Sequence, residues 1–280
     1  MYSLNYCKPG TISEAVSELK NSKNASLLAG GHTLIPALKQ RLANPSLVID
    51  LAGCGLSSII KSTHAIKIGA MTCHADVAKN KDVSEANPGL LMLARGIGDR
   101  QVRNCGTIGG SLANNDPAAC YPSAVLALSG TIHTNRRDIV AHEFFTGMFE
   151  TVLDDDELIT AVTLPNPLKS AYVKFPNPAS RYAMVGVFVA KFADSVQVAV
   201  TGAGEDGVFR AKDIEVALSD NFDAASLDGV TMSEDGLIED LHASPAYRAH
   251  LILEMARRAV AACQPASNVK TIKASCPNFF

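Results

Sequence analysis

The sequence predicts an α/β region followed by an α+β domain, and three observations support this fold class. Strand and helix patterns alternate over residues 2–51, a Gly-Gly pair there separates a predicted strand from a predicted helix, and beyond residue 170 the apolar runs become typical of antiparallel strands. A chain of 280 residues is also long for a single hydrophobic core. We therefore expect two lobes, 1–54 and 55–170, and a C-terminal domain, 171–280, with a small antiparallel sheet and helices.

The first lobe is predicted to be a βαβαβ unit. A helix is expected to start at Thr11, because Thr11 and Glu14 form a capping box ahead of apolar residues at helical spacing. A second helix is expected over 34–42, where apolar residues again recur at helical spacing. The predicted strands are the short apolar runs 2–7, 25–28 and 47–51.

The remaining elements follow from the same patterns. Residues 95–117 are rich in Gly and Asn, so they are expected to be a long irregular segment, which is usually functional in a compact domain. Further strands are predicted at 65–69, 131–133, 138–140, 158–164, 184–192, 196–201 and 214–218. Further helices are predicted at 76–79, 88–93, 121–128 and 245–263.

Composition excludes several classes of protein. Hydrophobic residues make up 47% of the chain, which excludes a disordered protein. The net charge is −3 and no basic block is present, so no nucleic-acid partner is expected. No apolar run approaches the roughly 20 residues that a membrane helix needs, and no secretory signal is recognisable at the N-terminus.

The cysteines indicate a reducing compartment. None of the seven forms a C-x-x-C pair and their number is odd, so we expect free thiols and a cytoplasmic location. Because clusters need closely spaced cysteines, no iron–sulfur cluster is expected on this chain. No pair of histidines has metal-ligand spacing, and no G-x-S-x-G elbow is present.

The first candidate binding loop is Ala29-Gly30-Gly31-His32-Thr33, between a predicted strand and a predicted helix. Glycine lets a phosphate approach without meeting a Cβ, and the N–H groups at the start of a helix point outward without partners. His32 either orients the loop or is solvated. The alternative interpretation of the whole loop is a simple Gly-Gly turn.

The second candidate loop is Thr107-Ile108-Gly109-Gly110-Ser111, which continues through Asn115 and Asp116. Glycines flanked by hydroxyl and amide side chains suit a ligand that has both a charged linker and a polyol. The alternative is a polar loop whose Asn and Asp side chains only satisfy turns. Composition alone does not name the ligand.

A third glycine pattern, Gly202 to Gly207, formally matches G-x-G-x-x-G. A dinucleotide-binding fingerprint must open a helix, whereas Val208-Phe209-Arg210 follows here, and Glu205 and Asp206 would repel a diphosphate. A β-hairpin turn is therefore the preferred interpretation.

At the first two loops the chain resembles the FAD-binding medium subunits of the xanthine dehydrogenase and carbon monoxide dehydrogenase family, the molybdenum hydroxylases. The resemblance covers nearly the whole chain, and the paired Gly-Gly motifs at this separation are specific. The stretches that carry it are AGGHTLIPALKQRL (29–42), VIDL (48–51), RQVRNCGTIGGSLANNDPAACYPSAVLAL (100–128), YVKFPNPASRYAMVGV (172–187) and SPAYRAHLILEMARRAV (244–260).

The resemblance implies a two-lobed FAD-binding domain of the PCMH type, with FAD between the lobes. It implies that residues 29–33 hold the FAD diphosphate, that residues 107–111 wrap the flavin side, and that Lys174 and Tyr182 lie near the flavin. Cys120 stands where the family usually has an aspartate that contacts the flavin, so Asn115 or Asp116 is expected to compensate.

The resemblance further implies three subunits. A large partner would hold the molybdenum cofactor and oxidise the substrate, and a small partner would carry two [2Fe–2S] clusters. This chain would pass electrons from those clusters through FAD to NAD, a quinone or oxygen. Two alternatives are a self-sufficient FAD-dependent oxidoreductase with its own substrate, and a scaffold that has lost flavin.

Overall fold

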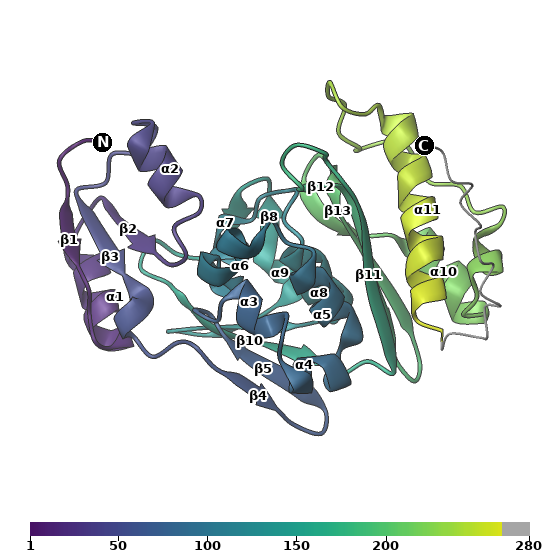
Figure 1. Ribbon diagram of the computed structural model, residues 1–280, viewed down its shortest axis with the longest axis horizontal. Helices are drawn as coiled ribbons and strands as arrows, with labels where there is room; N and C mark the ends of the chain where they lie inside the picture. Colours follow the sequence, from purple (N-terminus) through teal and green to yellow (C-terminus); the bar gives the residue numbers. More distant parts are fainter. Residues whose placement is uncertain (265–280) are drawn as a thin grey trace, which may run out of the picture.

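Three β-sheets with associated helices follow one another along the chain, giving a mixed α/β fold (Figure 1). The computed structural model describes residues 1–264. Cys276 and the part of the expected C-terminal domain beyond residue 264 lie outside the described residues. Within residues 1–264, no helix combines the length and the apolar character needed to cross a membrane.

The first sheet is parallel, in the strand order β1-β3-β2, and it confirms the predicted βαβαβ unit. Thr11 caps the first helix by accepting from Glu14 N, while the Glu14 carboxylate accepts from Gly10 N at 2.7 Å instead of from Thr11. The elements are β1 (Asn5–Cys7), α1 (Ile12–Asn21), β2 (Ala25–Leu28), α2 (Leu34–Lys39) and β3 (Leu47–Asp50).

The second sheet has five strands in the order β4-β5-β10-β6-β7, joined as antiparallel pairs. Its strands are β4 (Ile59–Lys61), β5 (Ala65–Gly69), β6 (Thr131–Thr134), β7 (Asp138–Val140) and β10 (Ile159–Pro165). The associated helices are α3 (His74–Val77), α4 (Lys81–Ala86), α5 (Pro88–Arg95), α6 (Arg100–Cys105), α7 (Ile108–Asn114), α8 (Tyr121–Ala127) and α9 (Ala141–Phe144). A small hairpin joins β8 (Phe145–Gly147) to β9 (Glu150–Thr151).

The prediction that 95–117 is irregular was wrong, because this segment contains α6 and α7. Each helix is started by a side-chain cap: Asp99 accepts from Val102 N, and Thr107 accepts from Gly110 N. Tertiary packing outweighs the poor helix propensity of Gly109, since a Cβ there would lie 2.6 Å from the Ala70 Cβ.

The third sheet is antiparallel, in the order β11-β12-β13-β14. The prediction of a strand at 214–218 was wrong, because Ile214 and Leu218 are buried on one face of a helix, four residues apart. The Gly202 to Gly207 segment forms the predicted hairpin. The elements are β11 (Lys169–Pro176), β12 (Ala183–Lys191), β13 (Val196–Gly204), β14 (Gly207–Arg210), α10 (Lys212–Asp220) and α11 (Pro245–Ala262).

Helices cover both faces of this sheet. Helices α5 and α8 pack on the face that points to the middle of the molecule, and α11 and α10 pack on the opposite face, at the right of Figure 1. Side chains alternate accordingly along β12: Phe188 joins the central core, while Val187 and Val189 join the core under α11. The sheet is therefore a shared wall between two hydrophobic cores.

Arg248 of α11 fixes the end of this wall at which β12 begins. The side chain is 2% exposed, and its Nη1 donates to Met184 O and Gly202 O at 2.7 and 2.8 Å. Its Nη2 donates to Asp240 at 2.7 Å. Buried carbonyl oxygens need donors, so Arg248 ties β12 and β13 to α11.

Replacing Arg248 by leucine is expected to lower the free energy of unfolding by about 3 kcal/mol, because two buried carbonyl oxygens lose their donor. Urea denaturation measures the change. Arg258→Leu is the matched control, since Arg258 is exposed on the same helix and pairs only with Glu254. Equal shifts in the two variants would contradict the assignment.

Candidate cofactor-binding cleft

A cleft of about 610 Å³ opens where the first sheet, helix α7 and the loop between β11 and β12 come together. This volume is typical of small-molecule and cofactor sites. The cleft collects nearly all the residues singled out from the sequence, although they come from three distant stretches of chain. Of these residues, Ala29, Gly30, Gly31, His32, Thr33, Thr107, Gly109, Gly110, Ser111, Asp116, Cys120, Lys174 and Tyr182 line it.

The first loop presents unpaired backbone donors. Among the described residues, no acceptor receives the N–H groups of Gly30, Gly31, His32 or Thr33. Gly31 has φ +70°, a conformation that favours glycine, and Thr33 makes no side-chain capping bond at the start of α2. Four consecutive free donors beside a cleft favour anion binding over a simple turn.

The same loop is held firmly from behind. A Cβ on Gly30 would lie 2.7 Å from Gly106 Cα, so this glycine is required by close contact between two backbones. His32 Nε2 lies 3.1 Å from Val102 O in α6. Of the two interpretations of His32, the structure favours the one in which it orients the loop.

The backbone amides of the second Gly-Gly pair are not available to bind a ligand. Its amides are already used inside the protein: Gly109 N donates to Ala70 O at 2.8 Å, and Gly110 N donates to Thr107 Oγ1 at 3.1 Å. Ser111 N donates to Thr107 O. This motif therefore supplies a closely packed helix, and the amides of Gly109, Gly110 and Ser111 are not bare main-chain donors.

Helix α7 instead offers side chains to the cleft. Ser111 and Asn114 line the cleft, and neither side chain makes a hydrogen bond to any described residue. Asn114 is one of the polar residues that follow the second Gly-Gly pair, although it was not among the predicted site residues. A hydroxyl and an amide on one helix face can both donate and accept, which suits a polyhydroxylated ligand.

Two predicted residues do not reach the cleft. Ile108 is fully buried in the central core. Asn115 is 1% exposed, and its amide nitrogen donates to Gly147 O and Glu150 O, both at 2.8 Å. Asn115 also tolerates a left-handed backbone with φ +40°, as Asn often does. It therefore holds the β8–β9 hairpin and is not available to replace a missing carboxylate.

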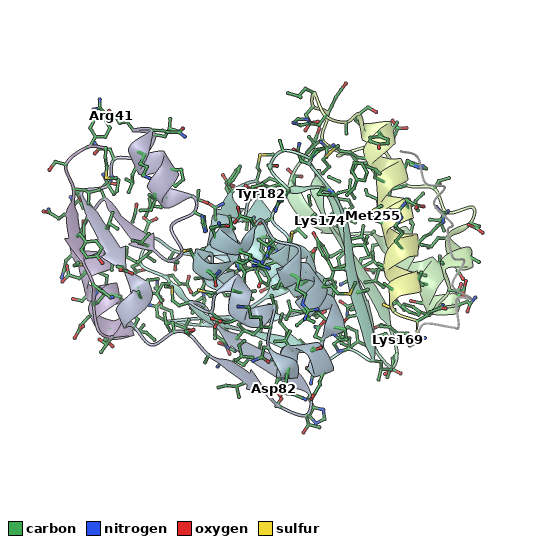
Figure 2. The ribbon with its side chains drawn as sticks, viewed as in Figure 1. Arg41, Asp82, Lys169, Lys174, Tyr182 and Met255 are labelled. Carbon is green, nitrogen blue, oxygen red and sulfur yellow. The ribbon has the colours of Figure 1, made fainter. Side chains whose placement is uncertain are left out.

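The opposite wall comes from the third sheet. Lys174 Nζ lies 3.6 Å from Cys120 Sγ and donates to Arg181 O at 2.8 Å. Figure 2 shows Lys174 and Tyr182 near the middle of the molecule, between α2 and α11. Partial burial, with smaller contributions from Asp116 and Cys120, raises the pKa of Tyr182, whose side chain remains half exposed at the cleft.

Two further ionisable residues of the cleft were missed. Glu157 is 4% exposed, and hydrogen bonding from Arg137, with help from Thr134 and Asp154 N, lowers its pKa to about 2. His74 is 6% exposed, and burial lowers its pKa to about 4, with smaller contributions from His32 and Arg103. Neither stands in a recognisable motif, so only the folded chain reveals them. No metal site is formed by His, Cys, Asp or Glu clusters within residues 1–264.

Acid should destabilise the protein through His74. Because its pKa is depressed by folding, the unfolded chain binds a proton there between pH 6.5 and about 4 that the folded chain does not. Stability is thus full above pH 6.5 and is lost as the pH falls toward 4, by up to about 3 kcal/mol at 1.36 kcal/mol per pKa unit.

Urea denaturation across this pH range tests the expectation. His74→Gln should have a shallower pH dependence than the original chain, whereas the exposed His142→Gln should keep the full dependence. An unchanged slope in His74→Gln would show that other groups dominate.

Comparison with known proteins places the cleft in a family. The family model described as "FAD binding domain in molybdopterin dehydrogenase" matches residues 2–167. The nicotine 6-hydroxylase medium subunit of Paenarthrobacter nicotinovorans is 34% identical over 92% of this chain and 96% of that protein. The carbon monoxide dehydrogenase medium chain of Hydrogenophaga pseudoflava is 30% identical over 91% and 95%.

Solved structures agree. Carbon monoxide dehydrogenase from Hydrogenophaga pseudoflava, lacking the Mo-pyranopterin moiety of the molybdenum cofactor, matches with a TM-score of 0.83 at 29% identity, over 94% of this chain and 97% of that chain. Reconstituted carbon monoxide dehydrogenase from Oligotropha carboxidovorans matches with a TM-score of 0.85 at 28% identity, over 94% and 98%. The chain belongs to the family of FAD-binding domains found in molybdopterin dehydrogenases.

Proposed function

We propose that this chain is the FAD-carrying medium subunit of a molybdenum-containing hydroxylase or dehydrogenase. Electrons pass from [2Fe–2S] clusters on a small partner subunit to FAD in the cleft, and then to an external acceptor such as NAD, a quinone or oxygen. The molybdenum cofactor and the substrate pocket belong to a large partner subunit. Curated relatives named as medium chains and complex subunits support the assignment.

The observation that carries the proposal is the row of free N–H groups at Gly30, Gly31, His32 and Thr33. A diphosphate is the part of FAD that such a row recognises, because consecutive amide donors match its oxygens without requiring a cationic side chain. The hydroxyl of Thr33, also without a capping partner, adds a further donor.

The division into lobes at 1–54 and 55–170 and a third domain at 171–280 belongs to the same proposal. In this arrangement, of the PCMH type, FAD lies between the lobes, and its ring faces the wall formed by Lys174 and Tyr182. Cys120, beside Lys174, takes the place of a carboxylate there. The free thiols among the described residues support a cytoplasmic location.

The protein's own contribution is binding and shielding. The first loop anchors the diphosphate, Ser111 and Asn114 meet the polyol, and the half-exposed Tyr182 side chain forms part of the cleft wall. When bound, flavin supplies the exchange between one-electron carriers and a two-electron acceptor. The residues of the cleft fix where the ring lies and which charged groups surround it.

Expression of the chain with and without its neighbouring subunits tests the proposal. We expect the complex to contain FAD and to co-purify with one molybdenum subunit and one iron–sulfur subunit. Turnover of a small substrate by this chain alone would favour a self-sufficient oxidoreductase instead. A colourless chain that does not bind added FAD would overturn the assignment.

Gly110→Val should abolish FAD binding. A Cβ at Gly110 would lie 3.0 Å from Thr107 Oγ1 and 3.4 Å from the Ala29 Cβ, so valine methyl groups would press on the helix cap and enter the gap between α7 and the first loop. Gly10→Val is the control, because a Cβ there meets only the Glu14 carboxylate at 3.6 Å. FAD content after gel filtration measures both; normal flavin in Gly110→Val would place the cofactor elsewhere.

A further inference from the structure

Thr201 of β13 connects the third sheet to a wall of the cleft. Thr201 is fully buried, and its hydroxyl lies 2.8 Å from Pro117 O and 2.6 Å from Ala119 O. The next residue, Gly202, donates its N–H to Pro117 O at 2.7 Å. The segment they hold, 116–120, lines the cleft through Asp116, Ala118, Ala119 and Cys120.

The two acceptors of the hydroxyl differ in their other donors. Thr201 carries a single donor hydrogen, and Pro117 O also accepts from the Gly202 N–H. Within residues 1–264, no other group donates to Ala119 O. The Thr201 hydroxyl is therefore the sole protein donor to the carbonyl that immediately precedes Cys120.

The anchor point is itself rigid. Gly202 has φ +82°, and a Cβ there would collide with Ala183 O, so only glycine fits. Its carbonyl accepts from the buried Arg248. Thr201 thus extends from a part of β13 that is fixed on both sides, so its hydroxyl can hold the 116–120 segment in place.

Lys174 completes the argument from the same sheet. It reaches Cys120 Sγ from β11, so the position of Cys120 is set jointly by Lys174 and, through Ala119, by Thr201. A shift of the 116–120 segment would change the distance between Cys120 and Lys174. It would also move the Asp116 carboxylate, whose charge contributes to the raised pKa of Tyr182.

We infer that Thr201 is a positioning residue of the cofactor cleft, and that its hydroxyl holds the 116–120 wall in the geometry that binds FAD. The inference rests on the proposed function, and it assigns part of the cofactor site to a residue that does not line the cleft. It also gives the third sheet a direct role in cofactor affinity.

The test is the affinity of the deflavinated full-length complex for FAD, measured by fluorescence quenching. Thr201→Val keeps the shape of the side chain but removes the hydroxyl, and it should raise the Kd for FAD about tenfold, which corresponds to about 1.4 kcal/mol. Thr201→Ser keeps the hydroxyl and should restore the Kd to within about twofold of the original. The visible circular dichroism of bound flavin should change in Thr201→Val only.

Thr163→Val provides the matched control. Thr163 is a half-buried strand residue whose hydroxyl lies 2.7 Å from His133 Nε2, away from the cleft. This variant should lose stability without a change in the Kd for FAD. If it weakens FAD binding as much as Thr201→Val does, loss of a buried hydroxyl is sufficient and the positioning role is overturned.

The remaining outcomes are also decisive. If Thr201→Val does not fold, Thr201→Cys, with its weak S–H donor, takes its place and should give an intermediate Kd. Equal Kd values for the original chain and the hydroxyl-free variant would overturn the inference while leaving the FAD assignment intact. An original chain that binds no FAD would instead refute the proposed function.

Discussion

The cleft depends on a contact between backbones that leaves no room for a side chain. Gly30 lies against Cys105 and Gly106, and a Cβ on Gly106 would in turn lie 2.6 Å from His74 Nε2. Gly30 and Gly106 therefore allow three parts of the chain to pack on one another. These parts are the first loop, the turn between α6 and α7, and the buried imidazole of His74. Because the loop is pressed onto this support, its free N–H groups face the cleft in one fixed arrangement, and electrostatic preorganisation of that kind strengthens anion binding.

The third sheet contributes to the same cleft because both of its faces are covered. Its central face packs under α5 and α8, β11 brings Lys174 to the cleft, and α11 fixes the other face. Lys174 and Thr201 sit on this sheet, one lining the cleft and the other holding its wall. The binding of a cofactor between the first loop and α7 would consequently depend on the packing of a sheet that begins at residue 169.

The sequence predicted those parts of the fold in which local pattern and tertiary packing agree. The βαβαβ unit and the helix over 245–263 have clear periodicity, and the structure confirms both. Helix α7 was missed because glycine disfavours helix, and the Thr107 cap together with packing against Ala70 explains why it forms. The run 214–218 is too short for periodicity to distinguish a strand from a helix. In the cleft, His74 and Glu157 were missed because each acquires its position only through contacts distant in sequence.

The two Gly-Gly pairs show why a glycine motif alone does not define a phosphate site. At Gly30-Gly31 the amides are free and the first glycine serves close packing, whereas at Gly109-Gly110 the amides are bonded to Ala70 O and Thr107 Oγ1. Part of the difference arises from what precedes each pair. Thr107 caps its helix and uses its hydroxyl on Gly110 N, while the first pair stands three residues before its helix and has no such cap. An anion-binding loop is therefore distinguished from a packing motif by whether each N–H already has an acceptor within the protein. A hydroxyl residue two or three positions before the glycines indicates that a glycine N–H is already bonded to that hydroxyl.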